Sequence, residues 1–175
     1  MKQLPLLDKT IANGVIETIY EEIRASLGLG IFTSTIFNSI VLLEYAMRVR
    51  VFEERLKNDK NAKWEHVEKL KMRNLISQLR QKEIIDDKGK KALDSFNDEL
   101  RNPYLHINIH EMIQGIFANN VKVVNTKTGT MTVQNGVDVS KNRQLWFAGK
   151  KLFDKTYVFK VLNFCIDWTN KLLKR

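Results

Sequence analysis

Apolar residues recur at helical spacing near the start of the chain. Four of them repeat every four positions: Ile11, Val15, Ile19 and Ile23. This spacing predicts a helix from about Asp8 to Ser26, with Asp8 or Thr10 as its cap. Gly28 and Gly30 then end that helix.

A second helix is predicted from Ser34 or Thr35 to about Lys57. Its inner stripe consists of Ile36, Ile40, Leu43 and Met47. Because only a short glycine-containing connection separates the two segments, they are expected to pack as an antiparallel pair.

The middle of the chain predicts two more helices. One runs from about Lys63 to Lys82, and the next begins at Asp86 or Asp87, which are good capping residues, and continues to Arg101. Pro103 lacks an amide donor and disfavours a helical conformation in the preceding residue, so a kink or break is expected at Asn102. Helical character is expected to resume from His106 to about Ala118.

The hydrophobic period then changes to short β-favouring runs rich in valine. Thr-Lys-Thr-Gly and Asn-Gly separate these runs, which predicts a hairpin within residues 120–140, with room for a third short strand. A last helix is predicted from about Leu152 to Leu173 and buries Cys165. The chain is therefore expected to be a single domain over residues 1–175. Its fold class is mainly α, an up-down bundle of four to five helices with a small β-hairpin insertion before the C-terminal helix.

Composition agrees with a folded, water-soluble domain. Apolar residues make up 43% and charged residues 28% of the chain, and its lone cysteine cannot form an internal disulfide. The start of the chain lacks the pattern of a signal peptide. The uncharged stretch from Ala25 to Leu43 has almost the length of a membrane span, but its glycine, serine, threonine and asparagine residues favour a turn and a buried helix. A cytoplasmic protein without membrane association is expected.

Positive charge is concentrated near the end of the chain. Residues 140–175 contain nine basic and two acidic residues, so they carry +7 of the net charge of +9. Such a segment can bind an anionic partner, and Lys150, Lys151 and Lys155 are its candidate RNA-binding residues. The alternative is that these lysines only solvate the outer face of a helix.

The histidines do not form a recognisable metal motif. His106 and His110 are four residues apart, but neither a His-Glu-x-x-His pattern nor a cysteine partner accompanies them, and His66 is expected on the surface. No glycine-rich phosphate loop or nucleophile elbow is present. We therefore expect no metal and no cofactor.

Arg101, Asn102 and His106 form the candidate catalytic group. An imidazole can pass a proton in either direction near neutral pH, and a guanidinium pairs with phosphate oxygens. This combination suits attack by a ribose 2′-hydroxyl on the adjacent phosphorus, with Asn102 orienting the imidazole or the phosphate. On a straight helix Arg101 and His106 point about 140° apart, so they converge only if the arginine wraps around or the axis bends.

The run from Leu100 to His106 resembles the R-x(4–6)-H signature of the HEPN superfamily of helical nucleotide-binding domains. The segment from Ile40 to Arg48 is similar to that family's second helix, where an acidic residue faces the site, and this implies a supporting role for Glu44. The resemblance covers about two thirds of the chain. It differs from some family toxins at Asn108, where they carry tyrosine.

The resemblance implies a metal-independent endoribonuclease that leaves a 2′,3′-cyclic phosphate, in the role of a toxin or defence effector. It also implies a homodimer in which Arg101 and His106 of both copies form a composite site, with RNA as substrate and a nucleotidyltransferase-type antitoxin as a further partner. Two other interpretations remain open at the level of sequence. The chain could be a non-catalytic nucleotide-binding, RNA-binding or accessory module, or an interaction domain that pairs through its hairpin edge. The Arg-Asn pair could also be no more than a surface turn.

Overall fold

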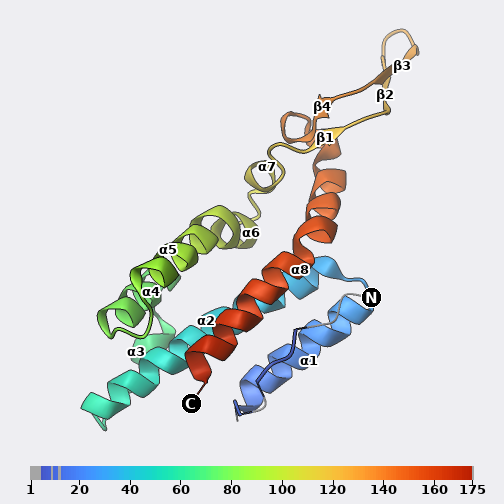
Figure 1. The fold of residues 1–175 in the computed structure, drawn as a ribbon. Coiled ribbons are helices and arrows are strands. Elements are labelled where there is room, and N and C mark those ends of the chain that lie inside the picture. The colour runs from blue at the N-terminus through green and yellow to red at the C-terminus, as the bar shows by residue number, and fades with distance from the viewer. Residues whose placement is uncertain (1–4, 9, 12, 175) are drawn as a thin grey trace.

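Helices make up most of the computed structural model, which describes residues 5–8, 10, 11 and 13–174 (Figure 1). The long helices are α1 (Gly14–Gly28), α2 (Phe32–Asn58), α4 (Met72–Gln81), α5 (Asp87–Phe96) and α8 (Trp146–Leu173). Three short helices lie between them: α3 (Glu65–Glu68), α6 (Asn102–Leu105) and α7 (Ile109–Met112). The predicted fold class, mainly α with a small β insertion before the last helix, is confirmed.

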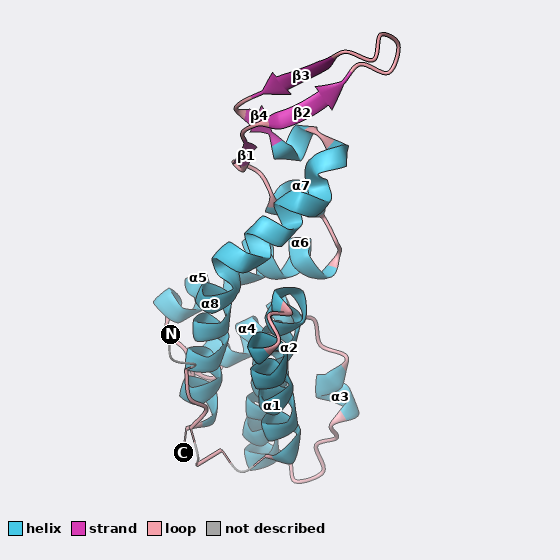
Figure 2. Ribbon diagram, turned by 90° about the vertical axis from the view of Figure 1, so that its right-hand side faces the viewer, coloured by secondary structure: helices cyan, strands magenta, loops and turns pink. Residues whose placement is uncertain are grey.

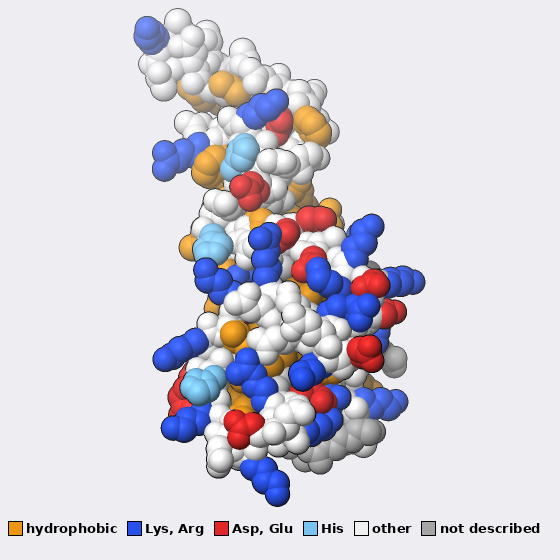
Figure 3. All heavy atoms as spheres, turned by 90° about the vertical axis from the view of Figure 1, so that its left-hand side faces the viewer, with side chains coloured by type: hydrophobic (Ala, Val, Ile, Leu, Met, Phe, Trp, Pro, Cys, Tyr) orange, Lys and Arg blue, Asp and Glu red, His pale blue; other side chains and the backbone are white. Residues whose placement is uncertain are grey.

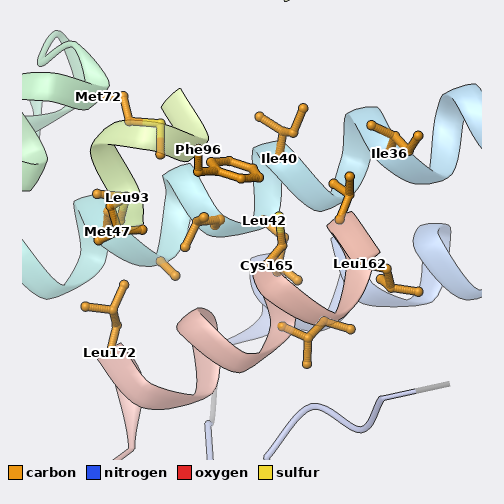
Figure 4. Packing of buried hydrophobic residues seen from close by; sticks show 14 of the residues in the cluster. Ile36, Ile40, Leu42, Met47, Met72, Leu93, Phe96, Leu162, Cys165 and Leu172 are labelled. Atoms are coloured by element: carbon orange, nitrogen blue, oxygen red, sulfur yellow. The ribbon is translucent and has the colours of Figure 1, made fainter. Parts of the chain in front are cut away.

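Helix α2 is the centre of the bundle, because α1, α4 and α8 all pack against it. Fully buried side chains from α2, α5 and α8 meet in the core shown in Figure 4, among them Ile40, Leu93 and Cys165. Two buried hydroxyls in α2 are satisfied locally, since Ser39 donates to the Thr35 carbonyl at 2.7 Å and Thr35 donates to the Ile31 carbonyl at 3.1 Å. The uncharged stretch of the sequence is thus a turn and a core helix. No helix in the described part of the chain combines the length and apolarity needed to cross a membrane.

The first helix begins later than predicted and turns a different stripe inward. Asn13 is its cap, and its side chain accepts hydrogen bonds from the amides of Val15 and Ile16 at 3.1 and 3.3 Å. Starting there, the helix buries Ile16, Tyr20 and Ile23 and leaves Val15 48% exposed. Two positions within the predicted helix, Lys9 and Ala12, lie outside the described residues.

The single helix predicted from Lys63 to Lys82 is wrong, because an extended residue separates α3 from α4. Lys71 has φ −70° and ψ 154°, so the helical hydrogen-bond pattern stops before it. The guanidinium of Arg48 on α2 donates to the carbonyls of Glu68 and Leu70, at 3.3 and 3.4 Å. This tertiary contact satisfies carbonyls that a continuous helix would have bonded internally.

Of the kink or break predicted at Asn102, the break is wrong, since Asn102 is helical with φ −65° and ψ −50°. Immediately before it, residues Asn97–Arg101 form a π-helical turn, η1, in which the Asn102 amide bonds to the Asn97 carbonyl. A wider turn relieves the clash that Pro103 would otherwise make with a preceding carbonyl, so the helix continues through the proline. The helix then ends at His106, and Ile107 has a positive φ of 55°. The continuous helix predicted from His106 to Ala118 is therefore replaced by α7 alone.

The β insertion contains two small antiparallel sheets. Strands β2 (Val121–Val124) and β3 (Met131–Gln134) form the predicted hairpin, and β1 (Phe117–Ala118) pairs with β4 (Val137–Asp138) at its base. Figure 2 shows the hairpin projecting beyond the helices. Helix α8 follows and begins at Trp146, six residues before the predicted start, after two 3-10 turns. The Trp146 indole donates to the Ser140 carbonyl at 2.9 Å and ties this start to the insertion.

Candidate functional site

Glu44 is the buried carboxylate around which the candidate site is built. It lies in the middle of α2 with 10% of its side chain exposed, and it accepts a hydrogen bond from Nε of Arg101 at 2.7 Å. Its other oxygen accepts from Nη1 of Arg48, one helical turn further along α2, at 3.2 Å. A buried carboxylate needs such charged partners. The ion pair joins α2 to the π-helical turn and fixes the direction of the Arg101 side chain.

Arg101 is held a second time by its neighbour in the sequence. The Asn102 side-chain oxygen accepts from Arg101 Nη1 at 2.8 Å. The side chain of Arg101 is 21% exposed, and its Nη2 has no hydrogen-bond partner within the described residues. This nitrogen is the donor that a phosphate oxygen could use without displacing the contacts that orient the guanidinium.

His106 ends α6 and opens onto the same groove as Arg101 and Asn102. The groove has a volume of about 700 Å³ and is also lined by the segment between α3 and α4. The imidazole is exposed and has no hydrogen-bond partner within the described residues. The three predicted catalytic residues are therefore brought to one hollow on the surface, with Glu44 behind it.

The walls of this groove are positively charged. Arg48, Lys69, Lys71 and Arg73 line it together with Arg101, and the acidic side chain of Glu68 lines it as well. Arg73 is paired with Asp98 at 2.9 Å, and this hydrogen bond lowers the pKa of the Asp98 carboxyl. In the described part of the chain neither Lys69 nor Lys71 has an ion-pair partner. Figure 3 shows Lys, Arg and His side chains spread over one side of the molecule, with acidic side chains between them.

Apart from Arg101, the basic residues that line the groove were not identified from the sequence. Lys69 and Lys71 fall within the segment that was predicted as one continuous helix, whereas in the structure they lie at the break between α3 and α4 and line the groove with Arg101. The spacing of Glu44 and Arg48 is a signal that was available, because residues four apart on a helix lie side by side.

The predicted RNA-binding lysines lie at a different place, on α8. Lys150 is mostly buried and contacts the carboxylate of Asp154 at 2.6 Å and the hydroxyl of Tyr104 at 3.0 Å. Lys151 and Lys155 are exposed and line a separate pocket with Lys150. The structure thus places Lys150 in a buried polar cluster and leaves the other two lysines facing solvent.

Tyr104 anchors the motif segment in that cluster. Its hydroxyl donates to Asp154 at 3.1 Å, and the Asp154 side chain, only 3% exposed, also accepts from Thr33 of α2. Burial and the nearby Asp154 carboxylate raise the pKa of Tyr104 well above its ordinary value. The short helix α6 is therefore fixed from both sides, by Glu44 through Arg101 and by Asp154 through Tyr104.

His110 and Cys165 do not line the groove. His110 lies next to Trp146, with ring centroids 6.3 Å apart. Among the residues that the structure describes, no group of three His, Cys, Asp or Glu side chains is placed to hold a metal ion. Cys165 is in the core, where burial raises the pKa of its thiol.

Comparison of the chain with protein-family models, with curated proteins and with solved structures finds no match. The geometry of the groove is therefore the basis on which a function is proposed.

Proposed function

We propose that the chain is a metal-independent endoribonuclease of the HEPN type, as the resemblance of its sequence motif suggests. The observation that carries the proposal is the convergence of Arg101, Asn102 and His106 on one basic groove, with Arg101 oriented by the buried Glu44. An oriented guanidinium and an exposed imidazole are what cleavage by an internal 2′-hydroxyl requires. RNA supplies the nucleophile, so the protein has to provide only proton transfer and charge stabilisation.

In this mechanism the 2′-oxygen bonds to phosphorus, the bond from phosphorus to the 5′-oxygen breaks, and a 2′,3′-cyclic phosphate is left. His106 accepts the proton of the 2′-hydroxyl. Arg101 donates from Nη2 to a non-bridging oxygen, where negative charge increases in the transition state. The proton needed by the departing 5′-oxygen comes from water or from His106 of a second copy, since the composite homodimeric site is part of the proposal.

The critical variant is His106→Ala, with His66→Ala as its matched control. Both histidines are exposed, but His66 lines a different hollow, away from Arg101. We expect His106→Ala to reduce cleavage of unstructured RNA at least about hundredfold in the presence of a chelator, while His66→Ala cleaves as the parent does. The measurement is product formation on denaturing gels, with cyclic phosphate ends identified by mass spectrometry. Equal rates for the two variants would show that the assignment of His106 is wrong.

A second candidate function is a non-catalytic RNA-binding or accessory module. It is favoured by one observation, namely that within the described residues no group hydrogen-bonds to His106 and fixes its tautomer. This candidate predicts salt-sensitive RNA binding without cleavage. Cleavage by the parent that is lost in His106→Ala distinguishes the two candidate functions, because a pure binding module would cleave RNA neither as the parent nor as His106→Ala.

As a toxin or defence effector, the protein would arrest growth when expressed. We expect the arrest to be relieved by His106→Ala and to persist with His66→Ala. A neutralising antitoxin of the nucleotidyltransferase type belongs to the same proposal.

A further inference from the structure

A second hollow lies on the other side of α6 from the groove, where α8 passes the start of α2. Its volume is about 300 Å³, and it is lined by Ile31, Phe32 and Thr33 on one wall and by residues of α8 on the other. This pocket, called the α8 pocket below, contains none of the residues that line the Arg101 groove.

The floor of the α8 pocket is electrically neutral. The carboxylate of Asp154 is paired with Lys150 and accepts hydrogen bonds from the Thr33 and Tyr104 hydroxyls. Lys150 also lies over the Tyr104 ring, 4.2 Å from its centroid. Because these groups satisfy one another, Asp154 does not repel an anion that approaches the rim.

The rim combines an exposed aromatic ring with positive charge. Phe147, Lys151 and Lys155 follow one another at four-residue spacing on α8, so they form one stripe along the helix. Phe147 is 81% exposed, which is unusual for so large an apolar side chain. Within the described part of the chain, Lys151 and Lys155 have no ion-pair partner.

The side chains of this stripe indicate which kind of ligand the pocket would bind. A flat exposed ring stacks on a nucleobase, and neighbouring lysines attract the phosphates that connect bases. An acidic peptide would use the lysines but not the ring. A membrane surface would use both, but it favours a broad face over a hollow between two helices.

We propose that the α8 pocket binds a nucleotide of single-stranded RNA, with the base on Phe147 and adjacent phosphates on Lys151 and Lys155. This inference rests on the proposed function in that it makes the pocket a substrate subsite distant from the cleaved bond. It assigns Lys150 to the floor of the pocket and leaves the other two lysines to bind RNA. A single strand is required because the bases of a duplex are not available for stacking on a protein ring.

The test measures binding of a short fluorescein-labelled oligouridylate by anisotropy, with every protein carrying His106→Ala so that the RNA stays intact. In this background, Lys151→Glu with Lys155→Glu should weaken binding about tenfold or more and reduce the slope of log affinity against log salt by about 1 to 1.5. Phe147→Ala should weaken binding about tenfold with the salt slope unchanged. The matched control is Lys88→Glu with Lys91→Glu, which makes the same charge change on exposed positions of α5 and should retain most of the affinity.

Unchanged affinity in both pocket variants would overturn the inference, as would an equal loss in the α5 control. It would also be overturned if Phe147, Lys151 and Lys155 were needed for binding to phosphatidylserine vesicles and not for binding to oligouridylate. Failure of the proposed function gives a different result. If the protein does not cleave RNA but the pocket variants still lose oligouridylate binding, the RNA subsite stands without the ribonuclease.

Discussion

Glu44→Gln tests the contact on which the geometry of the groove depends. The substitution keeps the shape of the side chain but removes the negative charge that faces Arg101 and Arg48. Both guanidiniums are about four-fifths buried, with side-chain exposures of 21% and 20%, so water compensates only in part for the lost partner. We expect the protein to be destabilised and Arg101 to lose its fixed orientation.

The magnitude follows from the contacts. A hydrogen bond to a charged group contributes about 1.5–3 kcal/mol, and Glu44 makes two of them. Glutamine retains one oxygen that can accept from Arg101 Nε, and the partly exposed arginines recover some hydration. We therefore expect the free energy of unfolding to fall by about 2–3 kcal/mol, which corresponds to a decrease in Tm of roughly 5–10 °C for a chain of this size.

Urea unfolding followed by far-ultraviolet circular dichroism measures this loss, with Glu21→Gln as the control. Glu21 forms an exposed pair with Arg24 on α1, in which the two side chains are 64% and 53% exposed. The same substitution there should change the free energy of unfolding by less than about 0.5 kcal/mol. If the two substitutions had the same small effect, Glu44 would not be the buried partner of Arg101, and the orientation argument would be refuted.

Two further changes probe the surroundings of α6 and the insertion. The parent is expected to exceed Tyr104→Phe in free energy of unfolding, and this difference should shrink as the pH rises above about 10. The reason is that the buried phenol of the folded parent stays protonated, whereas the same phenol in the unfolded chain ionises. Urea unfolding of both proteins from about pH 8 to about pH 11 measures this difference. A difference in free energy of unfolding that did not change with pH would contradict the buried position of the hydroxyl. In Gly149→Ala, the added Cβ would lie 2.5 Å from Val139 Cγ1 and 3.2 Å from Ile113 Cδ1, so we expect about 1 kcal/mol of destabilisation despite the better helix propensity of alanine. Amide hydrogen exchange in Gly149→Ala should be faster than in the parent over residues 109–145 and unchanged in α2. If Gly149→Ala were instead more stable than the parent, this would show that the Val139 side chain rotates away from the added methyl group.

Local patterns in the sequence were sufficient for the elements that form through short-range forces. The Asp86 cap, the long apolar repeat of α2 and the β-favouring runs around the two glycine turns each predicted an element that the structure contains. The buried position of Cys165 also followed from its apolar neighbours. In these cases the residues within one or two turns determine the conformation, so no knowledge of distant contacts was needed.

Two of the wrong predictions concern places where a distant residue supplies the deciding hydrogen bond or contact. The guanidinium of Arg48 accounts for the interruption between α3 and α4, and no periodicity in that segment indicates it. The helix passes through Pro103 because a π-helical turn absorbs the clash, and that turn is stabilised where Arg101 reaches Glu44 on α2.

For the candidate site, too, some features could be predicted from the sequence and others depended on the tertiary structure. The sequence alone identified Arg101, Asn102 and His106 by the chemistry of their side chains, and it identified Glu44 through a resemblance. Only the tertiary structure determined that Glu44 orients Arg101, that Lys69 and Lys71 face the same groove, and that Lys150 belongs to a buried cluster. The physical reason is that side-chain chemistry is local, whereas burial and electrostatic pairing depend on which helices pack together.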